Sequence, residues 1–119
     1  MFAEDGVFEM PYLEDFGFPT RYDGREKIEG FFKFVSDLYP TFKLDNVKIL
    51  IDTPDQVFAE YEFTGESSKT GKTIHQLFFG RMVVEQGRIK LLREALNSVQ
   101  VARALYARGI PDLPAKLAN

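Results

Sequence analysis

One carboxylate of the sequence stands among apolar residues, in a segment with the composition of a β-strand. Glu94 lies between Leu92 and Leu96, and an apolar run at 73–85 precedes this segment. The two segments are separated by the dipeptide at 86–87, Gln-Gly, which is typical of a two-residue hairpin turn. The sequence therefore predicts a β-hairpin that carries Glu94 on its second strand.

The register of this hairpin decides which side chains accompany Glu94. With the turn at 86–87, Phe79 faces Glu94 and Arg81 faces Leu92, provided that neither strand contains a bulge. Because side chains alternate between the two faces of a strand, one face then carries a defined set. That set is His75, Leu77, Phe79, Arg81, Leu92, Glu94 and Leu96.

Glu94 in this setting is a candidate general acid or base. Apolar surroundings raise the pKa of a carboxyl group toward neutrality, where the group can both accept and release a proton. Arg81, its predicted diagonal neighbour, would instead hold Glu94 ionised and orient a polar ligand. The alternative is an ion pair with no role in function, because structural ion pairs also perturb pKa values.

His75 is a third candidate catalytic residue, because the pKa of histidine lies near neutrality. A lone histidine near the start of a strand is more often a surface residue than a catalyst. Tyr12, Tyr39 and Tyr61 are candidate hydrogen-bond donors in a pocket, or core residues whose hydroxyls reach the rim. The predicted ligand-contacting set is Phe8, Met10, Tyr12, Phe31, Val35, Tyr61, Leu77, Phe79, Leu92 and Leu96.

The elements that would position these residues follow from periodicity and from turn residues. A helix is expected from Asp23, which can cap it together with Glu26, up to Pro40, with its apolar residues along one face. Strands are expected at 6–12, 42–51, 56–64, 73–85 and 88–96, with a bend in the second of them near 45–46. A second helix is expected from Asn97 or Ser98 to about Ala107. The segment 13–22 is expected to be a loop, and 110–119 an irregular tail. One helix followed by a four-strand meander predicts an α+β fold, with a curved antiparallel sheet and helices on its concave face.

Composition restricts the class of protein. The 119 residues fit one domain, and 12 phenylalanines exceed what one core needs, which favours an apolar pocket or an interface. The chain has no cysteine and one histidine, so we expect no disulfide and no metal site. The net charge of −3 without a basic patch argues against nucleic acid as a partner. No membrane span or signal peptide is visible, so a cytoplasmic location is expected.

The last hairpin is apolar on both faces, and the chain supplies few helices to cover them. Covering the second face with another copy of the chain is the simplest solution, so a homodimer is expected.

Three segments together resemble a known family. They are FAEDGVFEMP at 2–11, YDGREKIEGFF at 22–32 and VVEQGRIKLLREALN at 83–97. They resemble the SnoaL-like group of the nuclear transport factor 2-like superfamily, which includes ketosteroid isomerase and polyketide cyclases, and they are most similar to the phenazine-biosynthesis A/B branch. The resemblance implies a cone-shaped α+β half-barrel with a deep apolar pocket, commonly a dimer, and no cofactor. It also implies that Glu94, in the Arg-Glu pair of the last strand, is the acid–base residue.

The sequence departs from this family at several functional positions. Met10 stands where ketosteroid isomerase has a catalytic aspartate, Phe31 lies where the phenazine branch has a histidine, and Gly80 or Arg81 falls near the oxyanion-hole aspartate. Family members usually carry one or two helices before FAEDG, so their absence implies a truncated start or a more open pocket. Two hypotheses therefore stand. One is an isomerase, cyclase or condensing enzyme that uses Glu94 on a hydrophobic cyclic substrate, and the other is a non-catalytic ligand-binding or dimerisation domain.

Overall fold

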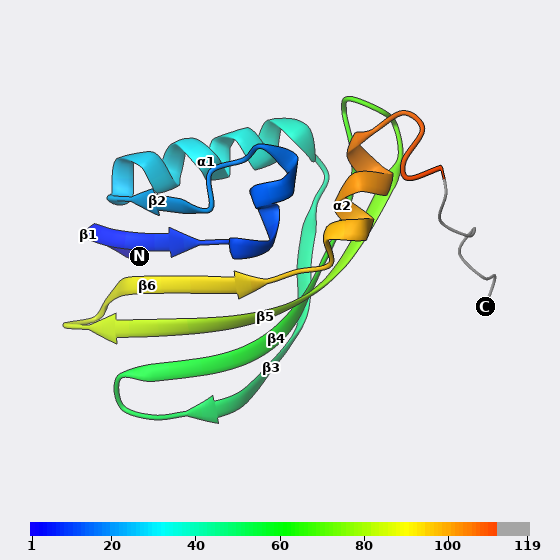
Figure 1. The fold of residues 1–119 in the computed structure, drawn as a ribbon. Helices are drawn as coiled ribbons and strands as arrows, with labels where there is room; N and C mark the ends of the chain where they lie inside the picture. Colours follow the sequence, from blue (N-terminus) through cyan, green and yellow to red (C-terminus); the bar gives the residue numbers. More distant parts are fainter. Residues whose placement is uncertain (112–119) are drawn as a thin grey trace.

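Six strands form one curved sheet in the computed structural model, which describes residues 1–111 (Figure 1). The strands are β1 (Phe2–Glu9), β2 (Arg21–Asp23), β3 (Lys43–Asp52), β4 (Gln56–Glu66), β5 (Thr73–Glu85) and β6 (Arg88–Ala95), in the spatial order β2-β1-β6-β5-β4-β3. The helices are α1 (Arg25–Leu38), α2 (Ser98–Leu105) and the 3₁₀ helix η1 (Pro11–Phe16). The α+β class with a curved, unclosed sheet is confirmed, and most of the predicted tail lies outside the described residues.

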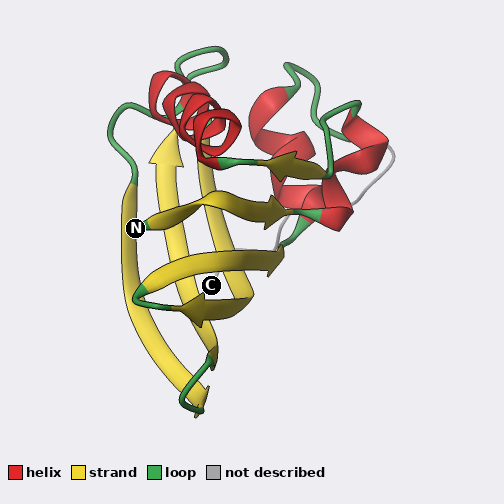
Figure 2. Cartoon of the chain, turned by 90° about the vertical axis from the view of Figure 1, so that its left-hand side faces the viewer, coloured by secondary structure: helices red, strands yellow, loops and turns green. Residues whose placement is uncertain are grey.

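The helices gather over one side of the sheet, as Figure 2 shows. We call the sheet face toward α1 the inner face and the opposite face the outer face. The core fills the space under the helices and includes the almost fully buried Phe8 and Ile28. None of the helices within residues 1–111 is long and apolar enough to cross a membrane.

The first strand differs from the expectation in bounds and in direction. β1 ends at Glu9, and Pro11 then opens η1, where a proline leaves no backbone N–H unpaired. The predicted loop at 13–22 thus contains most of η1 and the start of β2. β1 pairs with β6 in parallel, whereas the other strand pairs are antiparallel.

Helix α1 begins one residue later than predicted, without the expected capping box. Gly24 is the N-cap residue, at φ 93°, and no side chain caps the helix. Asp23 cannot serve, because it pairs with Val7 as the last residue of β2 and its carboxylate accepts a hydrogen bond from Arg21 Nε at 2.9 Å. The end of a strand takes precedence here over the local capping signal.

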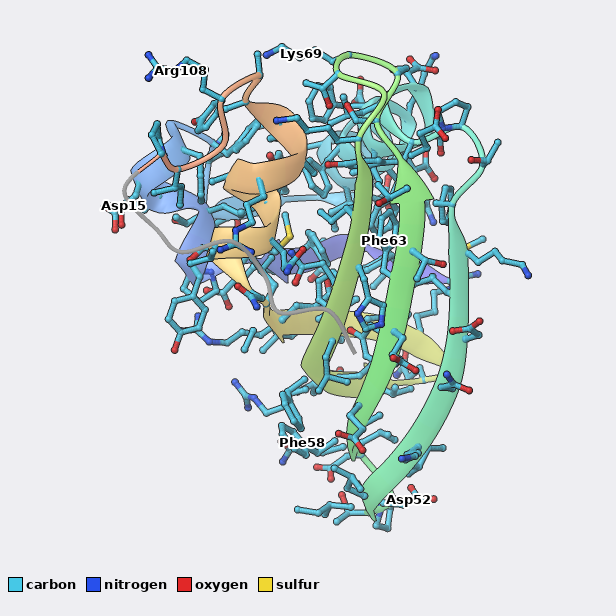
Figure 3. The ribbon with its side chains drawn as sticks, turned by 90° about the vertical axis from the view of Figure 1, so that its right-hand side faces the viewer. Asp15, Asp52, Phe58, Phe63, Lys69 and Arg108 are labelled. Carbon is cyan, nitrogen blue, oxygen red and sulfur yellow. The ribbon has the colours of Figure 1, made fainter. Side chains whose placement is uncertain are left out.

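The bend predicted in the second long strand is confirmed. Asn46 has φ 52°, and the pairing of β3 with β4 changes register between Asp45 and Lys48. A second register change, between Ile49 and Ile51, had no signal in the sequence. Figure 3 shows the curvature of the edge strand β3 next to β4, on which Phe58 and Phe63 are labelled.

The β5–β6 hairpin has the predicted turn and a different register. Gln86 and Gly87 have φ values of 52° and 73°, and Glu85 faces Arg88. The register changes between Val83 and Val84, so Glu94 pairs with Gly80. The predicted pairing of Glu94 with Phe79 is therefore wrong, because one extra residue in β6 moves every later side chain of that strand to the opposite face.

Helix α2 begins at the expected cap. The Asn97 side chain accepts a hydrogen bond from the backbone N–H of Gln100 at 3.2 Å. The buried Gln76 amide donates to the Asn97 carbonyl at 2.7 Å and accepts from the Asn97 N–H at 2.8 Å. These bonds fix the start of α2 on β5, and the helix ends at Leu105, two residues earlier than expected.

Candidate active site

An apolar cavity of about 550 Å³ lies between α1 and the inner face of the sheet. Seven of the residues predicted to contact a ligand line it: Phe8, Met10, Phe31, Val35, Tyr61, Leu92 and Leu96. Further residues that the sequence did not single out complete the wall, among them Phe78, Met82, Val101 and Leu105. The only charged side chain among the described residues that line this cavity is that of Glu94.

Glu94 reaches the cavity from β6 and is 9 % exposed. Its Oε2 accepts a hydrogen bond from the hydroxyl of Tyr61, which comes from β4. The ring of Tyr61 stacks on Phe78 of β5, with ring centres 5.5 Å apart and planes inclined by 19°. Three adjacent strands thus bring one carboxyl group and one phenol together in an apolar wall.

Gly80 permits this contact, because Tyr61 leans across β5 at this position. A Cβ atom on Gly80 would lie 2.5 Å from Tyr61 Oη and 3.1 Å from Cε1 of its ring. Any side chain there would displace the phenol. Gly80 is also the residue that faces Glu94 across β5 and β6, so the phenol that lies over Gly80 is brought next to the carboxyl group.

Burial changes the proton affinity of both groups. Removal from water raises the pKa of Glu94 to about 7, an effect that the hydrogen bond from Tyr61 partly opposes. Burial and the nearby carboxylate raise the pKa of the Tyr61 hydroxyl, which therefore stays protonated at neutral pH. Glu94 can thus exchange a proton near neutrality, and Tyr61 can act as a hydrogen-bond donor.

Arg81 and His75 do not accompany Glu94. The register change turns Glu94 to the inner face, whereas both of these residues lie on the outer face of β5, together with Leu77 and Phe79. Arg81 points to Gln56, with Nη1 3.5 Å from Oε1, and His75 Nε2 lies 2.7 Å from a carboxylate oxygen of Glu62. The predicted clustering of Arg81 and His75 with Glu94 is therefore wrong, and Leu77 and Phe79 do not line the cavity.

The three predicted tyrosines also differ in their position relative to the cavity. Tyr12 is exposed and lies outside the cavity lining, whereas Tyr39 belongs to the lining and packs against Phe63, with ring centres 5.5 Å apart. Two further polar side chains of the lining already have partners. Gln76 holds Asn97, and Ser36 Oγ donates to the carbonyl of Phe32 at 3.0 Å. The chemistry of the cavity is concentrated in Glu94 and Tyr61.

Within residues 1–111 no three histidine, aspartate or glutamate side chains gather in a group that could hold a metal ion.

The sequence profile of the SnoaL-like domain matches residues 1–92, which is most of the chain. The chain belongs to the SnoaL-like domain family. The match covers β1 to β5 and the first part of β6, and the resemblance drawn from the sequence motifs is thereby confirmed. No curated protein matches the chain significantly.

Several solved structures share this fold. A candidate isomerase from Bacillus subtilis superposes with a TM-score of 0.79 at 24 % identity, over 89 % of this chain and 76 % of that one. A phenazine biosynthesis-related protein from Pseudomonas aeruginosa superposes with 0.76 at 23 % identity, over 99 % and 71 %. A candidate SnoaL-like polyketide cyclase from Jannaschia sp. CCS1 superposes with 0.73 at 13 % identity, over 87 % and 72 %. At these identities the likeness establishes the fold.

Proposed function

We propose that this SnoaL-like chain is an acid–base enzyme of the isomerase or cyclase type, acting on a small hydrophobic cyclic molecule. The observation that carries the proposal is the Tyr61–Glu94 hydrogen bond in the wall of an apolar cavity. A carboxyl group whose pKa is about 7 is populated in both protonation states at neutral pH, as a proton shuttle requires. The names of two structural relatives, an isomerase and a polyketide cyclase, support the same reaction class.

The simplest reaction for this pair moves one proton on a ketone. The ionised Glu94 takes a proton from the carbon next to the carbonyl, and the electron pair of the C–H bond forms an enolate. Where a C=C bond is conjugated with the enolate, protonated Glu94 returns that proton to the far carbon and the double bond shifts, so the sum of atoms and charge is unchanged. In a saturated ketone the proton returns to the same carbon, and the step is seen only as hydrogen exchange. Tyr61 stays protonated and donates a hydrogen bond, either to Glu94 or to the developing enolate oxygen.

The cavity also limits the substrate class. No lysine, arginine or histidine belongs to the described residues that line it, so nothing there would compensate a buried anionic ligand. Its volume of about 550 Å³ lies within the range of pockets that hold small organic ligands. We therefore propose an uncharged cyclic ketone or a related carbonyl compound as substrate, with no cofactor in the reaction.

Proton exchange on a simple ketone tests this proposal without the natural substrate. Decalone is incubated with the protein in deuterated water, and NMR records the loss of hydrogen next to the carbonyl. We expect the wild-type protein to accelerate exchange, with a rate that rises as the pH passes through about 7. Glu94→Gln should lower the protein-dependent rate by at least about a hundredfold.

Two further variants sharpen the experiment. Tyr61→Phe removes the hydrogen bond that lowers the pKa of Glu94, so the pH midpoint of exchange should move upward while the rate falls about tenfold. Arg81→Gln is the matched control, because Arg81 lies on the outer face, and it should exchange at the wild-type rate. Wild-type exchange by Glu94→Gln would contradict the proposal.

A binding protein without catalysis is the second candidate. The observation that favours it is the placement of Arg81 and His75 away from Glu94, which leaves Tyr61 as the hydrogen-bond partner of Glu94 within residues 1–111. Saturable binding of decalone without any protein-dependent exchange would support this candidate instead.

A further inference from the structure

We propose that the same cavity binds lipophilic amines, which Glu94 holds as ammonium ions. The inference rests on the pocket of the proposed function, although it does not depend on catalysis there. It follows from three properties of the site: an oxygen of Glu94 that is open to the cavity, the lack of a competing cation, and aromatic walls.

The first property is the free oxygen of Glu94. Oε2 accepts the hydrogen bond of Tyr61, and Oε1 has no hydrogen-bond partner among residues 1–111. In the same part of the chain, every fully buried side-chain nitrogen or oxygen has a hydrogen-bond partner, so an oxygen without one is not fully buried. Oε1 is therefore accessible, and because Glu94 lines the cavity, the oxygen is reached from there.

The second property is the charge balance around Glu94. The titratable side chain that contacts Glu94 in the cavity wall is Tyr61, whose protonated hydroxyl is uncharged. The neighbouring cations Arg81 and Arg93 lie on the outer face, and Arg93 Nη1 binds Glu9 Oε2 at 2.9 Å. An ammonium ion in the cavity would thus be the first cation to face Glu94, and a charge-assisted hydrogen bond would form in apolar surroundings.

The third property is the aromatic lining. Phe8, Phe31, Phe63 and Phe78 all line the cavity, and Phe8 and Phe31 contact each other with ring centres 5.6 Å apart. Aromatic ring faces attract ammonium groups, and their edges pack against hydrocarbon. A ligand that combines an apolar ring system with one protonated amine satisfies both the carboxylate and the walls.

A pair of matched probes tests the inference by calorimetry. Naphthylmethylamine is protonated at about pH 8, and naphthylmethanol is its uncharged analogue of the same shape. We expect the amine to bind wild-type protein about tenfold more tightly than the alcohol at about pH 8, where Glu94 is ionised. At about pH 5.5 the carboxyl group is protonated, so the amine should lose this advantage while the alcohol binds unchanged.

Variants separate this inference from the proposed function. Glu94→Gln should abolish the preference for the amine and retain alcohol binding, whereas Arg81→Gln on the outer face should behave as wild type. Equal binding of both probes to the wild type, or an amine preference that survives Glu94→Gln, would overturn the inference and leave the pocket intact. Binding of neither probe would contradict both the inference and the proposed pocket.

Discussion

Glu94 and Tyr61 show how burial converts an ordinary side chain into a chemical group useful near neutrality. A carboxyl group in water is ionised at pH 7, but Glu94 lies in an apolar wall and accepts one hydrogen bond in the described part of the chain. The same burial keeps Tyr61 protonated as its donor. This arrangement costs stability, because an ionised carboxylate at this position lacks the hydration it has in the unfolded chain.

The pH dependence of stability follows from this cost. The pKa of Glu94 is raised to about 7 in the folded protein from a model value of 4.5, so the folded state binds a proton more tightly than the unfolded state. The stability from Glu94 is complete below about pH 4.5 and is lost as the pH rises through about 7, a change of about 3 kcal/mol. Urea unfolding across this range should show the decline in wild-type protein.

Glu94→Gln is the control for this measurement, because glutamine does not titrate. The difference in unfolding free energy between wild type and variant should shift in favour of the variant as the pH rises. A difference that is independent of pH between about 4.5 and about 7 would contradict the raised pKa.

At the scale of elements, the site depends on how three neighbouring strands align. The register change in the β5–β6 hairpin turns Glu94 inward, and the pairing of β4 with β5 places Tyr61 opposite Phe78, two residue pairs away from Gly80 and on the same face. Because Gly80 has no side chain, the Tyr61 ring can cross β5 and reach β6. The contact is therefore a property of the sheet, which only the correct register creates.

Gly80→Ala tests this dependence. The new methyl group would lie 2.5 Å from the Tyr61 hydroxyl oxygen, so the phenol must move away from Glu94. We expect decalone exchange to fall about tenfold, as in Tyr61→Phe, and stability to fall by about 1–3 kcal/mol. Both quantities are measurable on the same samples, by NMR and by urea unfolding.

Gly30→Ala is the matched control, since Gly30 lies in α1 and a Cβ atom there meets nothing within 4 Å. It should leave exchange unchanged and raise the unfolding free energy by roughly 0.5–1 kcal/mol, because alanine favours a helix over glycine. Wild-type exchange by Gly80→Ala would show that Tyr61 does not need its present position.

At the scale of the whole molecule, the outer face of the sheet bears apolar side chains that the described residues leave exposed. Leu77 is 45 % exposed and Phe79 is 39 % exposed, and Phe79 stacks on Phe58 with ring centres 6.1 Å apart. Ile51 faces Phe58 from the edge strand and is exposed as well. We propose that a second copy of the chain covers this patch of Ile51, Phe58, Leu77 and Phe79, because apolar patches of this kind mark interfaces.

Light scattering tests the dimer directly. Wild-type protein at tens of micromolar should have the mass of two chains, whereas Phe79→Lys should have the mass of one chain, since a buried unpaired lysine disfavours the interface. The variant should retain decalone exchange, because Phe79 lies on the face opposite the cavity. A monomeric wild-type protein at that concentration would contradict the proposed dimer.

Much of this molecule follows from sequence patterns that act locally. The apolar periodicity of 25–38 predicts α1, the Gln-Gly pair at 86–87 predicts the hairpin turn, and Asn97 predicts the start of α2. Each of these signals depends on neighbours within a few residues, so the sequence contains all the information. The sequence also predicts Glu94, from the apolar residues Leu92 and Leu96 of its own predicted strand, which line the cavity with it, and from the family resemblance. The other two predicted neighbours, Leu77 and Phe79, depend on the hairpin register and lie on the other face.

The companions of Glu94 were decided by tertiary structure alone. Nothing local marks the bulge near Val83 and Val84, yet this one-residue change exchanges Arg81 for Tyr61 as the neighbour of Glu94. The reason is physical: strand side chains alternate with a period of two, so a single bulge reverses every later assignment of that strand. The sequence thus determined the apolar wall and its carboxylate, and the sheet register decided that a phenol rather than a guanidinium meets it.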